Sequence, residues 1–149
     1  IEGTTTGTPA YMAPEVALGE TRVDGRADVY ALGCVAYFLL TGKRLFEDAN
    51  PMKVLIAHAQ EPPRRPSEFV PALSPEFDSL VLRCLEKSPE KRFPNAQALR
   101  SALLRCDESG GWTREDARAL VQRARRHGGL SETQALALAD KEVRLARRR

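Results

Sequence analysis

The stretch "RADVYALGCVAYFLLTG", residues 26–42, is the most continuously apolar part of the chain. From Arg26 to Leu40 the residues are apolar on nearly every side, which is typical of a helix buried all round. Thr41 and Gly42 supply a stop. The longest apolar run, Val29 to Leu40, is shorter than the roughly 18 residues that suggest a membrane span. The stretch therefore predicts a central buried helix.

Further helices are predicted along the rest of the chain. Pro51 opens a short one, since proline is tolerated at a first helical position. Ser74 is the expected N-cap of an amphipathic helix, and Asn95 caps another, in which Ala96, Leu99, Leu103 and Cys106 share a face. Two more helices are expected after Thr113 and Ser131. Because no alternating β-branched run is long enough for a strand, the chain is predicted to be all-α.

Composition sets the broad class of the protein. With 149 residues and 42% hydrophobic content, the chain can bury one domain core. Cys34, Cys84 and Cys106 lie far apart and form no CxxC or His/Cys cluster, which argues against a disulfide framework and against a zinc site. A cytoplasmic location is expected. The chain opens at Ile1 in a loop-like Gly/Thr-rich stretch, so it is expected to be a piece of a longer protein.

Charge is distributed unevenly along the chain. Residues 1–112 carry 13 Lys/Arg against 15 Asp/Glu, whereas residues 113–149 carry 10 against 5. This basic tail, with Arg123, Arg125, Arg126 and residues 147–149, leaves open binding to nucleic acid or to an anionic membrane surface. A solvated helix face is the simpler interpretation, and no aromatic residues interleave with these arginines. No nucleic-acid partner is therefore expected.

The stretch "GTPAYMAPE", residues 7–15, combines two prolines with one carboxylate. Pro14 fixes a helical φ, so it starts a short helix directly after an extended segment. Glu15 is then expected to point inward. Because a buried carboxylate is costly unless it is paired, a bidentate arginine is its expected partner, and Arg92 is the candidate.

Three elements occur in a recognisable order: "GTPAYMAPE", "RADVYALGCVAYFLLTGKRLF" and "CLEKSPEKRFPNAQAL". Their order and separation resemble the C-terminal lobe of eukaryotic-like protein serine/threonine kinases, and especially the bacterial ones. The resemblance covers residues 1 to about 106. It implies the helical lobe of the α+β kinase fold, without the N-terminal β-lobe, followed by a basic helical extension at residues 107–149.

The resemblance also implies roles for particular residues. Glu15 and Arg92 correspond to the family's structural ion pair, and Asp28 to the aspartate that anchors the catalytic loop. Thr8 corresponds to the threonine that sits near the catalytic aspartate in the substrate-positioning segment. Thr4, Thr5 and Thr6 fall in the activation loop, where a phosphate could recruit arginines. Plainer alternatives remain: a helix N-terminal acid for Asp28, and an unmodified solvated segment for Thr4–Thr6.

Phosphoryl transfer in this family also needs a glycine-rich loop, a strand lysine, an H-R-D…N catalytic loop and a D-F-G aspartate that binds magnesium. None of these motifs occurs in the 149 residues. The chain alone is therefore expected to be inactive and to bind neither ATP nor Mg²⁺, while the parent uses both to phosphorylate protein substrates. A non-catalytic kinase-like scaffold is the alternative.

Overall fold

The described part of the chain is built from helices alone. The computed structural model describes residues 9–108 and residue 122. Its elements are the 3₁₀ turns η1 (Pro9–Tyr11), η2 (Pro66–Glu68) and η3 (Pro89–Lys91) and the helices α1 (Pro14–Ala17), α2 (Arg26–Thr41), α3 (Pro51–Gln60), α4 (Pro75–Cys84) and α5 (Ala96–Glu108). No strand occurs in this part, which confirms the all-α prediction. None of its helices is long and apolar enough to pass through a membrane.

Side-chain caps fix where three of the helices begin. The Asn50 side chain accepts a hydrogen bond from the Met52 N–H at 3.0 Å and caps α3. The predicted caps of α4 and α5 are confirmed, because Ser74 accepts from the Phe77 N–H at 3.2 Å and Asn95 accepts from the Ala98 N–H at 2.8 Å.

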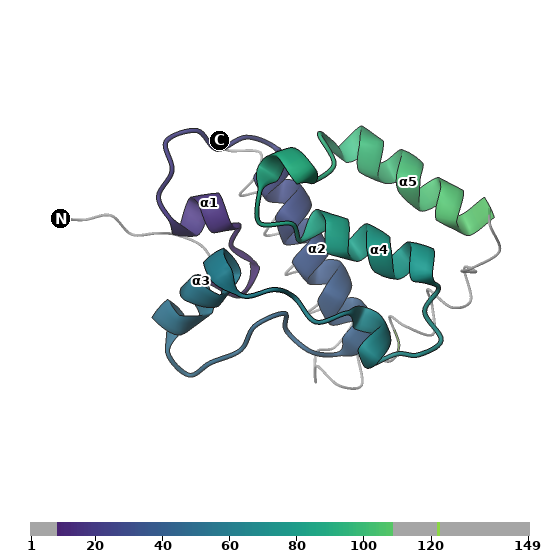
Figure 1. The fold of residues 1–149 in the computed structure, drawn as a ribbon, viewed down its shortest axis with the longest axis horizontal. Coiled ribbons are helices and arrows are strands. Elements are labelled where there is room, and N and C mark those ends of the chain that lie inside the picture. The colour runs from purple at the N-terminus through teal and green to yellow at the C-terminus, as the bar shows by residue number, and fades with distance from the viewer. Residues whose placement is uncertain (1–8, 109–121, 123–149) are drawn as a thin grey trace.

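Helix α2 occupies the centre of the molecule, with α1 and α3 to one side and α4 and α5 to the other (Figure 1). Its buried residues Tyr30, Cys34, Tyr37 and Leu40 are each at most 2% exposed and pack with residues of α4. The helix ends at Gly42, whose φ of 70° is left-handed and whose N–H donates to the Phe38 carbonyl at 2.8 Å.

Helices α2 and α4 approach each other closely at Gly33. A Cβ atom added to this glycine would lie 2.7 Å from the Cys84 Cβ and 3.0 Å from the Leu85 Cδ2, which is closer than side chains pack. The absence of a side chain at position 33 thus allows the central contact of the fold.

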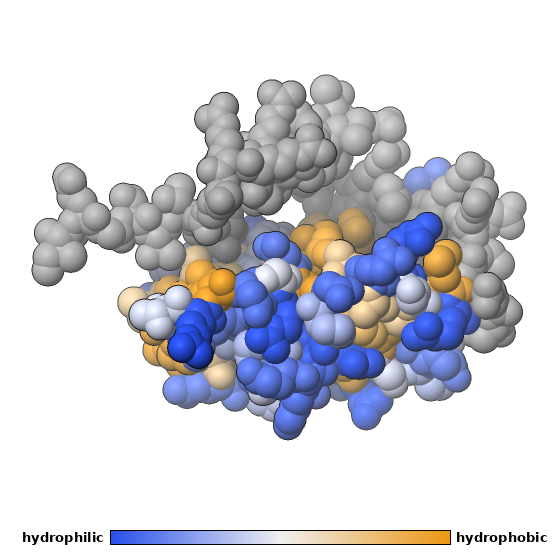
Figure 2. Space-filling model, turned by 90° about the horizontal axis from the view of Figure 1, so that it is seen from above, coloured by the Kyte–Doolittle hydropathy of each residue, from blue (hydrophilic) through white to orange (hydrophobic). Residues whose placement is uncertain are grey.

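The face of helix α5 that covers α4 agrees only in part with the one predicted. Leu99 and Cys106 do pack inward, but Ala98 and Ala102 pack beside them. The expectation was wrong for Ala96 and Leu103, which are exposed, because small alanines rather than a leucine stripe form the contact with α4. Seen from above, the coloured part of the surface is mostly hydrophilic, with separate hydrophobic areas (Figure 2).

Candidate functional site

A buried ion pair joins two residues that lie 77 positions apart. The Arg92 guanidinium donates from Nη1 to Glu15 Oε1 at 2.7 Å and from Nη2 to Glu15 Oε2 at 2.8 Å. The two residues are 2% and 3% exposed. Glu15 follows Pro14 in the first turn of α1, and Arg92 directly follows η3. The residues that the sequence analysis paired therefore lie in two-bond contact.

The remaining N–H groups of Arg92 bind backbone carbonyls. Nε donates to the Glu86 carbonyl at 2.7 Å, Nη1 to that of Arg26 at 2.9 Å and Nη2 to that of Lys87 at 3.0 Å. All five donors of the guanidinium are in use, which offsets the cost of burying its charge. One side chain thereby connects α1, the start of α2 and the loop after α4.

A second buried cluster adjoins this ion pair and is centred on His58 of α3. The Tyr30 hydroxyl of α2 and the His58 Nδ1 lie 2.8 Å apart. Lys87 donates from Nζ to the His58 carbonyl at 2.8 Å, and the Arg92 guanidinium lies over the Tyr30 ring at 5.0 Å. Sequence reasoning gave His58 no role, because Tyr30 and Lys87 lie 28 and 29 residues away and form no spacing motif with it.

Burial controls the charge states in this cluster. Burial, and to a smaller extent the nearby positive charge of Lys87, lowers the pKa of His58 to about 4. Burial also lowers the pKa of the Lys87 ammonium to about 8. At neutral pH the imidazole is therefore uncharged, and its two nitrogens act as one donor and one acceptor.

Asp28 lies on an exposed part of α2. Its carboxylate sits in the first turn of the helix and makes no hydrogen bond or ion pair with another described residue. Leu32 and Val35 follow at helical spacing and are 50% and 41% exposed. Asp28 therefore stands at the end of an open apolar stripe on α2.

Other residues singled out from the sequence lie outside the described residues. They are the predicted activation-loop threonines Thr4, Thr5 and Thr6, the substrate-positioning Thr8, and the tail arginines Arg123, Arg125, Arg126 and 147–149.

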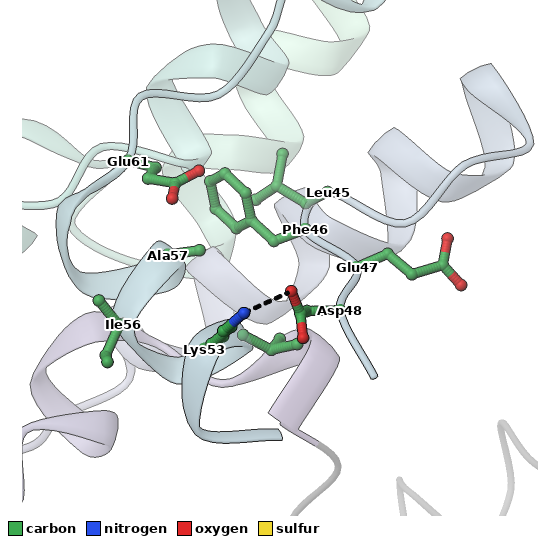
Figure 3. A pocket seen from close by; sticks show the side chains of 9 residues that line it. Leu45, Phe46, Glu47, Asp48, Lys53, Ile56, Ala57 and Glu61 are labelled. Atoms are coloured by element: carbon green, nitrogen blue, oxygen red, sulfur yellow. Dashed lines mark ion pairs between the residues drawn. The ribbon is translucent and has the colours of Figure 1, made fainter. Parts of the chain in front are cut away.

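A pocket of about 420 Å³ opens between α3 and the loop that precedes it (Figure 3). Its apolar wall includes Phe46 and Ala57. Its carboxylates do not converge on one point: Asp48 contacts Lys53 at 3.8 Å, and Glu47 points away from the pocket. In the part of the chain that the structure describes, no group of three His, Cys, Asp or Glu side chains could hold a metal ion.

Comparison with known proteins gives consistent matches. The family described as "Protein kinase domain" matches residues 2–104. Serine/threonine-protein kinase Pkn1 of Myxococcus xanthus is 50% identical over 101 residues, which are 68% of this chain and 14% of that protein. PksC of Streptomyces coelicolor is 45% identical over 103 residues, or 69% and 18% of the two chains.

PknB of Mycolicibacterium smegmatis, also named a serine/threonine-protein kinase, is 44% identical over 102 residues, or 68% of this chain and 16% of that protein. The chain thus spans less than a fifth of the length of each of these curated relatives.

Proposed function

Because the chain belongs to the protein kinase domain family, we propose that it is part of a serine/threonine kinase that transfers the γ-phosphate of ATP to protein substrates. The observation that carries this proposal is the buried Glu15–Arg92 pair, in which every guanidinium N–H has an acceptor. It holds the end of the "GTPAYMAPE" segment against α2 and the loop after α4. Residues 1–106 would form part of the kinase domain, and residues 107–149 an extension.

The segment ahead of Glu15 would position the substrate. Thr8 would lie beside the phosphate acceptor, and Thr4, Thr5 or Thr6 would carry the activating phosphate. In support, η1 directly follows Thr8 and packs against both α2 and α3, and Ala10 within it is only 6% exposed. A rigid support of this kind lowers the entropic cost of aligning a bound peptide.

The open stripe of α2 would receive the catalytic loop of the same kinase domain. Asp28 has a carboxylate free to accept backbone N–H groups, and such charge-assisted bonds are stronger than neutral ones. Leu32 and Val35 offer apolar surface beside it. The other half of the kinase domain is therefore the proposed partner of this face.

ATP and Mg²⁺ would bind to the other half of the domain. The motifs that hold both ligands in this family do not occur in residues 1–149, so we propose that these residues alone transfer no phosphate. Their contribution is to hold the protein substrate and to support the catalytic loop.

The coding DNA upstream of Ile1 tests the proposal. An in-frame H-R-D…N, a D-F-G and, farther back, a lysine and a glycine-rich loop are expected. The intact protein should then transfer labelled phosphate from ATP to serine or threonine. A reading frame in which the lysine or the metal-binding aspartate is replaced, in a protein that transfers no phosphate, would indicate a scaffold and contradict the proposal.

A further inference from the structure

His58 is a fully buried ionisable residue that the proposed function leaves without a role. It is 0% exposed, and its contacts come from different segments of the chain. Its Nδ1 lies 2.8 Å from the Tyr30 hydroxyl of α2, and the Phe46 ring stands edge-on to the imidazole with centroids 5.1 Å apart. The His58 side chain of α3 thus contacts both the central helix α2 and the loop after α2.

The second imidazole nitrogen, Nε2, is buried and has no hydrogen-bond partner among the described residues. The Ala10 backbone lies near enough to raise the pKa of His58, as a carbonyl beside an N–H does, but it does not reach hydrogen-bond geometry. Because Nδ1 faces Tyr30, Nε2 is the nitrogen available to Ala10. A buried donor without an acceptor is costly, and the Ala10 carbonyl is the nearby group that could accept from it.

Residues 10–15 are therefore held at both ends. Arg92 holds the end at Glu15, and at the other end the η1 turn with buried Ala10 packs against α3, the helix that carries His58. The two supports share neighbours: the Lys87 carbonyl accepts from Arg92 at 3.0 Å, while the Lys87 ammonium donates to the His58 carbonyl at 2.8 Å. Tyr30 places its ring against the Arg92 guanidinium and its hydroxyl on His58.

We propose that His58 is a positioning residue for protein substrates, which holds the η1 turn at Ala10 in the shape that meets the substrate chain. The inference rests on the proposed kinase function, in which residues 7–11 position the substrate. His58 acts through Ala10 and touches no reacting group. Its loss should therefore weaken binding of the protein substrate and leave ATP binding unchanged.

Steady-state phosphotransfer by the intact protein tests this role, with dephosphorylated casein and ATP varied separately. His58→Leu is expected to raise the KM for casein about fivefold, the factor that one hydrogen bond of average strength is worth. The KM for ATP and kcat should stay within about twofold. His58→Gln should restore the KM for casein to within about twofold, because its amide side chain is long enough to place an N–H where Nε2 lies, toward Ala10.

Leu99→Ala is the control for lost stability. Leu99 is 7% exposed in the contact between α4 and α5, a different cluster from that of His58, so this change should lower stability without changing the KM for casein. An equal rise of that KM in Leu99→Ala, or an unchanged KM in His58→Leu, overturns the role of His58.

Tyr30→Phe decides the matter if His58→Leu does not fold. It keeps the ring and removes the hydroxyl, so a KM for casein about fivefold higher supports the proposal, and an unchanged KM overturns it. Wild-type protein that transfers no phosphate, to itself or to casein, overturns the kinase function and this inference with it. Active wild type with an unchanged His58→Leu overturns only the inference.

Discussion

Arg92 uses every N–H of its guanidinium, so its replacement leaves several buried groups without partners. Arg92→Ala leaves the buried Glu15 carboxylate without a partner, and we expect it to lower the free energy of unfolding by about 3–5 kcal/mol. Denaturant titration of the intact protein measures this. The matched control is Lys91→Ala at the exposed neighbouring position, expected to stay within about 0.5 kcal/mol.

A double-mutant cycle separates the pair from its surroundings. The double variant Glu15→Ala/Arg92→Ala should lose clearly less unfolding free energy than the sum of the losses in the two single variants. The reason is that the second substitution removes a charged group that the first has already left unpaired. Additive costs would contradict direct coupling between the two side chains.

His58 should make stability depend on pH. Its pKa falls from 6.5 to about 4 in the folded chain, so between these values the unfolded state binds the proton and the folded state does not. The contribution of the neutral imidazole to the free energy of unfolding is therefore fully present above about pH 6.5 and decreases as the pH falls toward 4.

We therefore expect the stability advantage of wild type over His58→Asn to shrink by up to about 3 kcal/mol between pH 7 and pH 4. Urea unfolding of both proteins across this range measures the difference. Parallel pH profiles would show that His58 does not titrate in this way.

At the level of single residues, the sequence allowed the Glu15–Arg92 pair to be predicted but not the neighbouring cluster around His58. Glu15 and Arg92 could be paired because each sits in a recognisable local motif, and a buried carboxylate requires a partner. His58 could not be placed, because its role depends on Tyr30 and Lys87, which only the packing of α2, α3 and the loop after α4 brings near it.

Among the elements, the crossing of α2 and α4 depends on Gly33. Gly33→Ala adds a methyl group that would lie 2.7 Å from the Cys84 Cβ, so the helices must separate. The higher helix propensity of alanine does not compensate, and we expect a loss of about 1–3 kcal/mol in unfolding free energy. Thermal or urea unfolding measures it.

Gly25→Ala is the matched control for this change. Gly25 precedes α2 with a φ of −59°, and a Cβ there would meet nothing within 4 Å. Its unfolding free energy should stay within about 0.5 kcal/mol of wild type. An equal loss of unfolding free energy in Gly33→Ala and Gly25→Ala would contradict the role of the close contact between α2 and α4, because only Gly33 lies in that contact.

The beginnings of the helices were predictable because they depend on local chemistry. Ser74 and Asn95 cap helices with their own side chains, a signal that needs no knowledge of the fold. The packed face of α5 was predicted only in part, because both Ala102 and Leu103 lie beside Leu99 on the helix. The surface of α4 decides which of them is covered.

At the scale of the whole molecule, a change in the exposed stripe of α2 is expected to have different effects in residues 1–149 and in the intact protein. Leu32 is 50% exposed, so Leu32→Glu should change the unfolding free energy of residues 1–149 by no more than about 0.5 kcal/mol. In the intact protein this side chain would face the catalytic loop. A buried carboxylate without a partner should then sharply reduce phosphotransfer.

Met52→Glu on α3 separates this effect from the mere addition of charge. Met52 is 60% exposed and belongs to α3 rather than α2, so this variant should keep its phosphotransfer activity in the intact protein. Full activity of Leu32→Glu would mean that the stripe does not receive the catalytic loop. Loss of activity in Leu32→Glu alone would show that this face of α2 becomes an interior surface when the kinase domain is complete.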